Sequence, residues 1–222
     1  ILTEDRQSGQ HEAMHGLPLY SIGISSNRLE AYTKHAVVLN PEREESVAIM
    51  ANFSHHNQES HYGLREYDVA QNSLYAQLMY EAKFDGLHHV STGISLQHDS
   101  FDEKLVAFDG VLSDSETVPG VYAQYTFTKG TKISAMAGLR YDYSNIHGGF
   151  LTPRAHIKYQ PNNILSIRLS AGKGYRTARP LLENNNLLAS NRVMVIKDIV
   201  QEEAWNTGAS LAWYIPIMEK TL

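Results

Sequence analysis

The amino-acid sequence predicts an all-β fold, namely a segment of about nine strands from an antiparallel, up-and-down transmembrane β-barrel. Three observations predict this fold. Apolar residues recur at every second position over long stretches, short connections alternate with longer ones, and tyrosine is frequent, with 13 Tyr against 6 Phe in 222 residues.

The alternation of apolar and polar residues is clearest in the second half of the chain. In residues 132–142 the odd positions are apolar, from Ile133 to Tyr141, and the even positions are mostly polar or small. Because successive side chains of a strand point to opposite faces, this pattern gives one apolar and one polar face. The same pattern runs through residues 121–128, 151–160, 164–176 and 205–215, and less regularly through 28–39, 46–54, 73–81 and 89–97.

The connections between these stretches alternate in length. The short ones are residues 40–45, 83–87, 129–131 and 160–163. The longer ones are residues 58–66, 100–116, 145–149 and 177–202. The alternation predicts a sheet with tight turns at one end and loops at the other. The predicted strands have about 10 to 14 residues, against a usual length of ~5–6 in soluble proteins, and this favours strands that cross a membrane.

Composition excludes several other classes of protein. The chain has no Cys, which rules out a disulfide scaffold, a thiol nucleophile and a Cys-ligated metal. A net charge of −5 argues against a broad nucleic-acid-binding surface. No run of about 18 apolar residues predicts a transmembrane helix. A mean hydropathy of −0.34 still suits a barrel, since half of every strand faces water. The Tyr excess fits the aromatic belts at the two membrane interfaces.

Five motifs in the second half resemble strands of the TonB-dependent outer-membrane receptors, in the order and spacing of that family. Two of the most specific are LTPRAHIKYQP at residues 151–161 and LSAGKGYRTA at residues 169–178. The other three are residues 118–125, 137–142 and 202–208. The first half resembles the cobalamin- and siderophore-receptor branch less specifically.

The resemblance implies a barrel of about 22 strands filled by an N-terminal plug domain. It also implies short periplasmic turns, long extracellular loops, and uptake of a scarce nutrient energised through the periplasmic protein TonB. The expected partners are the plug, TonB, outer-membrane lipid and a metal chelate or similar nutrient, with no nucleic acid. The chain shows no plug sequence, no TonB box and no final strand. We therefore expect residues 1–222 to be a partial barrel domain from the outer membrane of a Gram-negative bacterium.

Two groups of side chains are candidates for function within this barrel. The first is a set of weak candidates for ligand binding at the extracellular rim and loops, with His61 and Tyr62 expected in a loop: His56, His61, Tyr62, Arg176, Arg179 and Asn185. The second is predicted to face the lumen and the plug: Arg140, Asp142, Arg154, Lys158, Arg168, Gly172 and Gly174. The arginines there could steer an anionic siderophore, or could simply bond the plug and one another.

No catalytic motif is present, so we predict no enzyme activity, no cofactor and no resident metal. The predicted function is active uptake of a ferric siderophore, haem or cobalamin, with the barrel wall and loops contacting the ligand. A passive porin-like channel and a soluble all-β carbohydrate-binding or structural protein are the alternatives. Solubility without detergent would favour the second alternative over a barrel.

Overall fold

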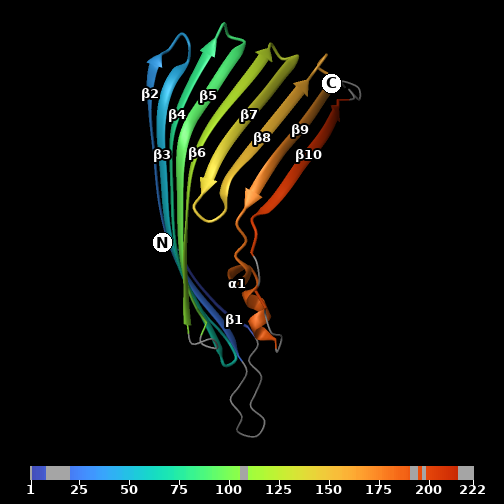
Figure 1. Cartoon of the computed structure of the whole chain (residues 1–222). Helices are drawn as coiled ribbons and strands as arrows, with labels where there is room; N and C mark the ends of the chain where they lie inside the picture. Colours follow the sequence, from blue (N-terminus) through green and yellow to red (C-terminus); the bar gives the residue numbers. More distant parts are fainter. Residues whose placement is uncertain (1, 9–20, 106–109, 191–194, 197–198, 215–222) are drawn as a thin grey trace, which may run out of the picture.

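The computed structural model describes residues 2–8, 21–105, 110–190, 195–196 and 199–214. These residues form one ten-stranded, strongly curved sheet and two short helices (Figure 1). The elements, in chain order, are β1 (Leu2–Ser8), β2 (Ile22–Asn40), β3 (Glu45–Tyr62), β4 (Arg65–Phe84), β5 (His88–Leu105), β6 (Gly110–Lys129), β7 (Ile133–Ser144), β8 (Gly148–Tyr159), β9 (Leu165–Arg176), α1 (Pro180–Glu183), the 3-10 helix η2 (Asn185–Ala189) and β10 (Glu202–Trp213).

The strands lie side by side in sequence order, and every neighbouring pair is antiparallel. This up-and-down order confirms the predicted fold class. Nine of the ten strands contain the stretches predicted from the period-two pattern, and β1 was missed. Within the described residues the sheet is open, with β1 and β10 at its edges. Neither described helix is long and apolar enough to cross a membrane.

Strand length divides the sheet into two parts. Strands β2 to β6 have 18 to 20 residues, whereas β7 to β10 have 12 each. At the end opposite the tight turns, β3 to β6 therefore run past the end of β7 and β8. We call these extensions the projecting half, and the part next to the tight turns the spanning half. About 9–11 tilted residues suffice to cross a bilayer, so strands of 18 to 20 residues extend well beyond one.

The projecting half corrects two sequence predictions. Residues 58–66 and 100–116 were expected to be long loops, but β3 continues to Tyr62, β4 begins at Arg65, and β5 continues to Leu105. Only Gly63 and Leu64 lie between β3 and β4, and Gly63 adopts a φ of 64°, which few side-chain-bearing residues tolerate. The prediction was wrong because the apolar residues change face in these extensions, so the pattern looks interrupted.

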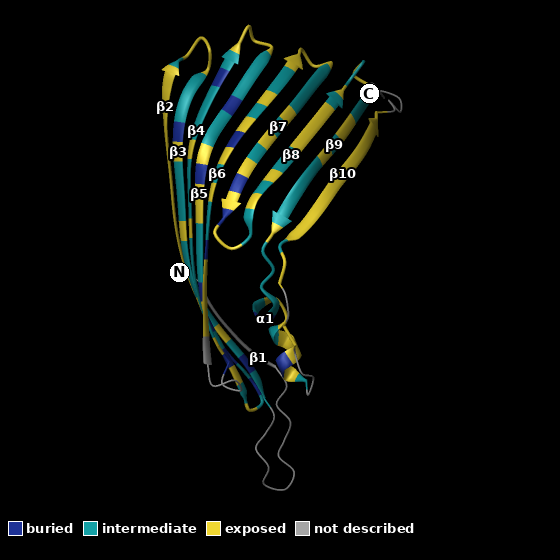
Figure 2. Cartoon of the chain, viewed as in Figure 1, coloured by how far each residue is buried: buried dark blue, intermediate teal, exposed yellow. Residues whose placement is uncertain are grey.

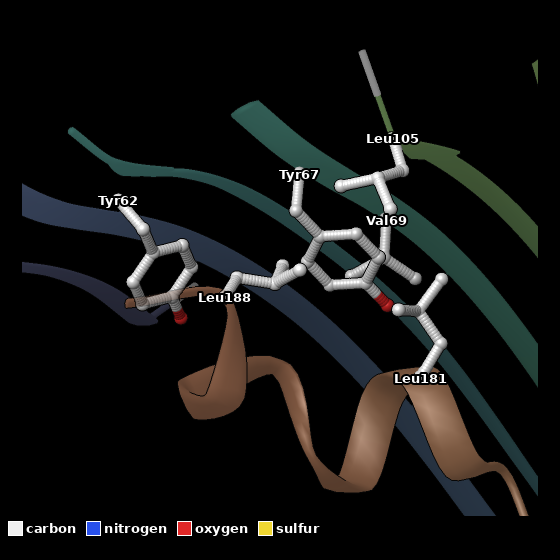
Figure 3. Packing of buried hydrophobic residues seen from close by; sticks show 6 residues of the cluster. All are labelled: Tyr62, Tyr67, Val69, Leu105, Leu181 and Leu188. Carbon is white, nitrogen blue, oxygen red and sulfur yellow. The ribbon is translucent and has the colours of Figure 1, made fainter. Parts of the chain in front are cut away.

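The connection from β9 to β10 folds back onto the projecting half. We call residues 177–190 the strap, because α1 and η2 lie across this part of the sheet. Leu181 and Leu188 of the strap pack against the sheet (Figure 3). Their buried partners are Tyr62, Tyr67, Val69 and Leu105. Arg65 fastens the same segment by donating from its guanidinium to the carbonyl oxygens of Leu188 and Ser190, at 3.1 and 2.5 Å.

Candidate functional site

The sheet has an inner face, which carries the strap, and an outer face. In the spanning half the outer face is the apolar one. Along β7, Leu139 and Tyr141 are 52% and 45% exposed, whereas Asp142 and Ser144, at the alternate positions that follow them, are 4% and 0% exposed. Figure 2 shows this alternation along the strands. A soluble protein shows the reverse arrangement, with apolar side chains buried.

The strand register places the predicted lumen residues on one face. Arg140 lies opposite Thr152 on β8, and Lys158 lies opposite both Ser134 and Arg168. Because directly opposed residues share a face, the register extends this relation to the whole set. The residues on the inner face are Arg140, Asp142, Arg154, Lys158, Arg168, Gly172 and Gly174.

Long inner-face side chains lean across glycines to reach the strand beyond. Arg140 on β7 passes over Gly120 on β6, and its guanidinium donates to the Ser95 hydroxyl on β5 at 2.6 Å. Arg154 on β8 likewise passes over Gly138 on β7 and donates to Gln124 on β6 at 2.8 Å.

A third contact follows the same rule one strand earlier. The Tyr122 ring on β6 covers Gly93 on β5, and its hydroxyl accepts a 2.9 Å hydrogen bond from Gln77 on β4. A methyl group added at Gly93 would lie 2.8 Å from that ring, and one added at Gly138 would lie 3.2 Å from Arg154. These glycines therefore make room for a layer of polar side chains that ties three strands together at each step.

An inner-face cavity of about 530 Å³ lies where the two halves meet. Strands β4 to β9 and the start of the strap line it. Its chemistry is mixed: three guanidiniums, three carboxylates and four aromatic rings face it, from Arg140, Arg176, Arg179, Asp99, Glu116, Asp142, Tyr75, Phe101, Phe150 and Tyr175. A neighbouring cavity of about 420 Å³ continues along the inner face past Arg140 to Arg154.

Arg179 and Thr177 fasten the strap to the rim of the larger cavity. Arg179 forms an ion pair with Asp114 on β6, and its guanidinium lies 4.2 Å from the centre of the Phe101 ring. Thr177 donates a 3.0 Å hydrogen bond to Glu116, which also accepts a 2.6 Å bond from Ser144. The strap thus closes one side of the cavity through charged, aromatic and hydroxyl contacts.

Tyr67 is a buried residue on the inner face of the projecting half. Its side chain is fully buried, and its hydroxyl donates to Glu103 at 2.9 Å. Burial raises the pKa of the Tyr67 phenol, and the nearby Glu103 carboxylate raises this pKa further. Tyr67 therefore stays protonated and remains a hydrogen-bond donor beneath the strap.

The candidates for ligand binding are only partly brought together. Arg176 and Arg179 line the 530 Å³ cavity. His56 lies on the inner face opposite Gln71, and Asn185 begins η2, but neither lines that cavity. The prediction that His61 and Tyr62 lie in a loop is wrong, since both belong to β3. Tyr62 is 5% exposed beneath the strap, so it packs as a core residue.

Sequence reasoning missed the residues that the extended strands contribute to the cavity. Phe101 and Glu116 fell within the predicted loop at residues 100–116, and Asp99 lay just before it and after the predicted strand at 89–97, so no face was assigned to them. The signal that would have found them is the spacing of Phe101 and Leu105, which continues a strand with its apolar side reversed. Among the described residues, no group of three or more His, Cys, Asp or Glu side chains is arranged to hold a metal ion.

Comparison with known families identifies the fold. The family model of the TonB dependent receptor-like β-barrel matches residues 40–214. The chain belongs to this family. The match confirms the resemblance inferred from the five motifs, and it covers β3 to β10. No curated protein sequence matches the chain closely.

A solved structure has the same fold. The FrpB iron transporter from Neisseria meningitidis (F3-3 variant) aligns with a TM-score of 0.51 at 12% identity, covering 96% of this chain and 47% of the transporter. The siderophore receptor PirA from Pseudomonas aeruginosa aligns with a TM-score of 0.49 at 8% identity, covering 72% of this chain and 30% of PirA. The chain thus spans less than half the length of either protein.

Proposed function

We propose that this chain forms part of the wall of an outer-membrane receptor for active uptake of a scarce nutrient in a Gram-negative bacterium. The observation that carries the proposal is the reversed polarity of the spanning half. Apolar side chains on the outer face suit lipid, and polar side chains on the inner face suit a wet interior or a plug domain. Transport is energised by TonB, as is expected of this family.

In this proposal the tight turns face the periplasm and the projecting half faces the outside of the cell. The 530 Å³ cavity then lies at the outer mouth of the barrel, beside the strap. We propose a metal chelate as the ligand, with iron first, since a structural neighbour that aligns over 96% of this chain is an iron transporter. Arg140, Arg154, Lys158, Arg168, Gly172 and Gly174 would face the plug below.

The test is uptake by cells that carry or lack the full-length receptor containing this chain. Deletion of its gene should slow growth on limiting iron and abolish uptake of at least one ferric chelate. The same loss should follow deletion of TonB, which a passive porin does not need. Unchanged chelate uptake in the TonB deletion strain would favour the porin-like alternative, and restoration by the reintroduced gene controls for indirect effects.

A further inference from the structure

The charge around the 530 Å³ cavity restricts the class of chelate that the cavity can take, an inference that rests on the proposed function. Each of the three arginines that line it is already neutralised. Arg140 Nε donates to Asp142 Oδ2 at 2.7 Å, and Arg179 pairs with Asp114. Arg176 pairs with two carboxylates, at 2.8 Å to Glu202 and 3.1 Å to Glu183.

Two further carboxylates of the cavity have only neutral partners among the described contacts. Asp99 accepts a 2.7 Å hydrogen bond from the Gln97 amide. Glu116 accepts its hydrogen bonds from the hydroxyls of Ser144 and Thr177. Counting the cavity lining and its ion-pair partners together, six carboxylates surround three guanidiniums.

Asp142 adds an incompletely satisfied oxygen to this excess. Its side chain is 6% exposed, Oδ2 is held by Arg140, and Oδ1 is buried without a hydrogen-bond partner. The neighbouring cavity does not offset the excess, because Arg154 there is accompanied by Glu81.

A concave wall concentrates the field of such fixed charges. We propose that this cavity selects a metal chelate of zero or positive net charge and disfavours a polyanionic one. Ferric iron bound by three singly charged hydroxamates is neutral, whereas ferric iron bound by three doubly charged catecholates carries three negative charges. The arginines do not steer an anionic siderophore here, because their charge is already balanced. The proposed ligand class is therefore a neutral ferric trihydroxamate, bound through aromatic contacts and the amide and hydroxyl groups of the wall.

The test compares two iron chelates on the purified full-length receptor in detergent, with binding followed by quenching of intrinsic fluorescence. A neutral ferric trihydroxamate should bind at least about tenfold more tightly than a ferric tris-catecholate at low ionic strength. Added salt should weaken the discrimination, because it screens the repulsion of the trianion. Tighter binding of the catecholate would overturn the inference while leaving the proposed uptake function intact.

Variants that each remove one carboxylate test whether the discrimination between the two chelates arises at this cavity. Asp99→Asn should strengthen binding of the catecholate complex several-fold and leave the hydroxamate complex unchanged, and Glu116→Gln should act in the same direction. Asp102→Asn is the matched control, because this exposed residue lies on the outer face of the same strand and should change neither. Equal effects of Asp99→Asn and Asp102→Asn would refute selection by this cavity.

Binding of neither chelate, together with no TonB-dependent iron uptake by cells, would overturn the proposed function itself.

Discussion

Strands β3 to β6 run through both the spanning and the projecting half, but they place their apolar side chains on opposite faces in the two halves. On β4, the outer face of the spanning half carries Leu74 and Leu78, and the inner face carries Gln77 and Glu81. In the projecting half the inner face carries the buried Tyr67 and Val69, and the outer face carries Glu66 and Asp68.

The change of face follows the change of solvent. The spanning half is surrounded by lipid in the proposed function, so its apolar side chains point outward. The projecting half stands in water on its outer side, so it builds an ordinary small core beneath the strap. A row of polar side chains marks the boundary on the outer face, where His55 bonds to Asn72 at 2.8 Å and Asn72 reaches Ser100 at 3.5 Å.

The largest effect expected from this comparison comes from a charge on the outer face. Leu139→Arg places a guanidinium where the spanning half meets lipid, and should lower the free energy of unfolding by ~2–4 kcal/mol. Ser113→Arg puts the same side chain on the exposed outer face of the projecting half, opposite Asp102, where water accommodates it. Urea unfolding of the full-length receptor in lipid vesicles measures both. An equal loss of unfolding free energy in both variants would show that the two outer faces meet the same solvent.

The second-largest effect tests whether the core of the projecting half is stabilised independently of the rest of the sheet. Leu181→Ala removes a buried side chain that joins the strap to Tyr67, and should destabilise the strap by about 2 kcal/mol. Faster hydrogen exchange in residues 180–190, with little change in the spanning half, is the expected result. Leu187→Ala is the matched control, since Leu187 also belongs to the strap, in η2, but is 36% exposed. Faster exchange throughout the sheet would contradict an independent core.

The sequence was sufficient to predict the spanning half and insufficient for the projecting half. Residues such as Leu139 and Arg140 alternate regularly because one solvent acts on each face along the whole strand. Around residues 70–74 and 97–101 the proposed function has the outer face pass from lipid to water. There the alternation shifts by one residue, which interrupts the periodic pattern. The strap could not be placed, because its contact with Tyr67 joins residues more than 100 positions apart and leaves no periodic signal.

The glycines that lie under long side chains give a smaller effect, confined to the inner face of the spanning half. Gly120→Ala would push its methyl group into the Asp142 carboxylate and to 2.8 Å from the Arg140 guanidinium. Both groups are side-chain ends that can shift, so the expected loss of stability is about 1–2 kcal/mol. Gly174→Ala serves as the control, since nothing lies within 4 Å of the position of its added methyl group. Equal stability of the two variants in vesicles would argue against the close contact over Gly120.

The smallest effect concerns the ion pair that joins the strap to β6. Arg179→Lys keeps the charge opposite Asp114 but loses the planar contact with the Phe101 ring. Asp114 is half exposed, so the pair itself should contribute no more than ~1 kcal/mol. A double-mutant cycle with Asp114→Asn, read from hydrogen exchange in the strap, isolates this coupling from the ring contact. A coupling free energy as large as the loss caused by Leu181→Ala would mean that the strap is held by charge, and its attachment would then weaken with added salt. A smaller coupling free energy leaves the buried leucines as the main attachment of the strap, and this attachment distinguishes the projecting half.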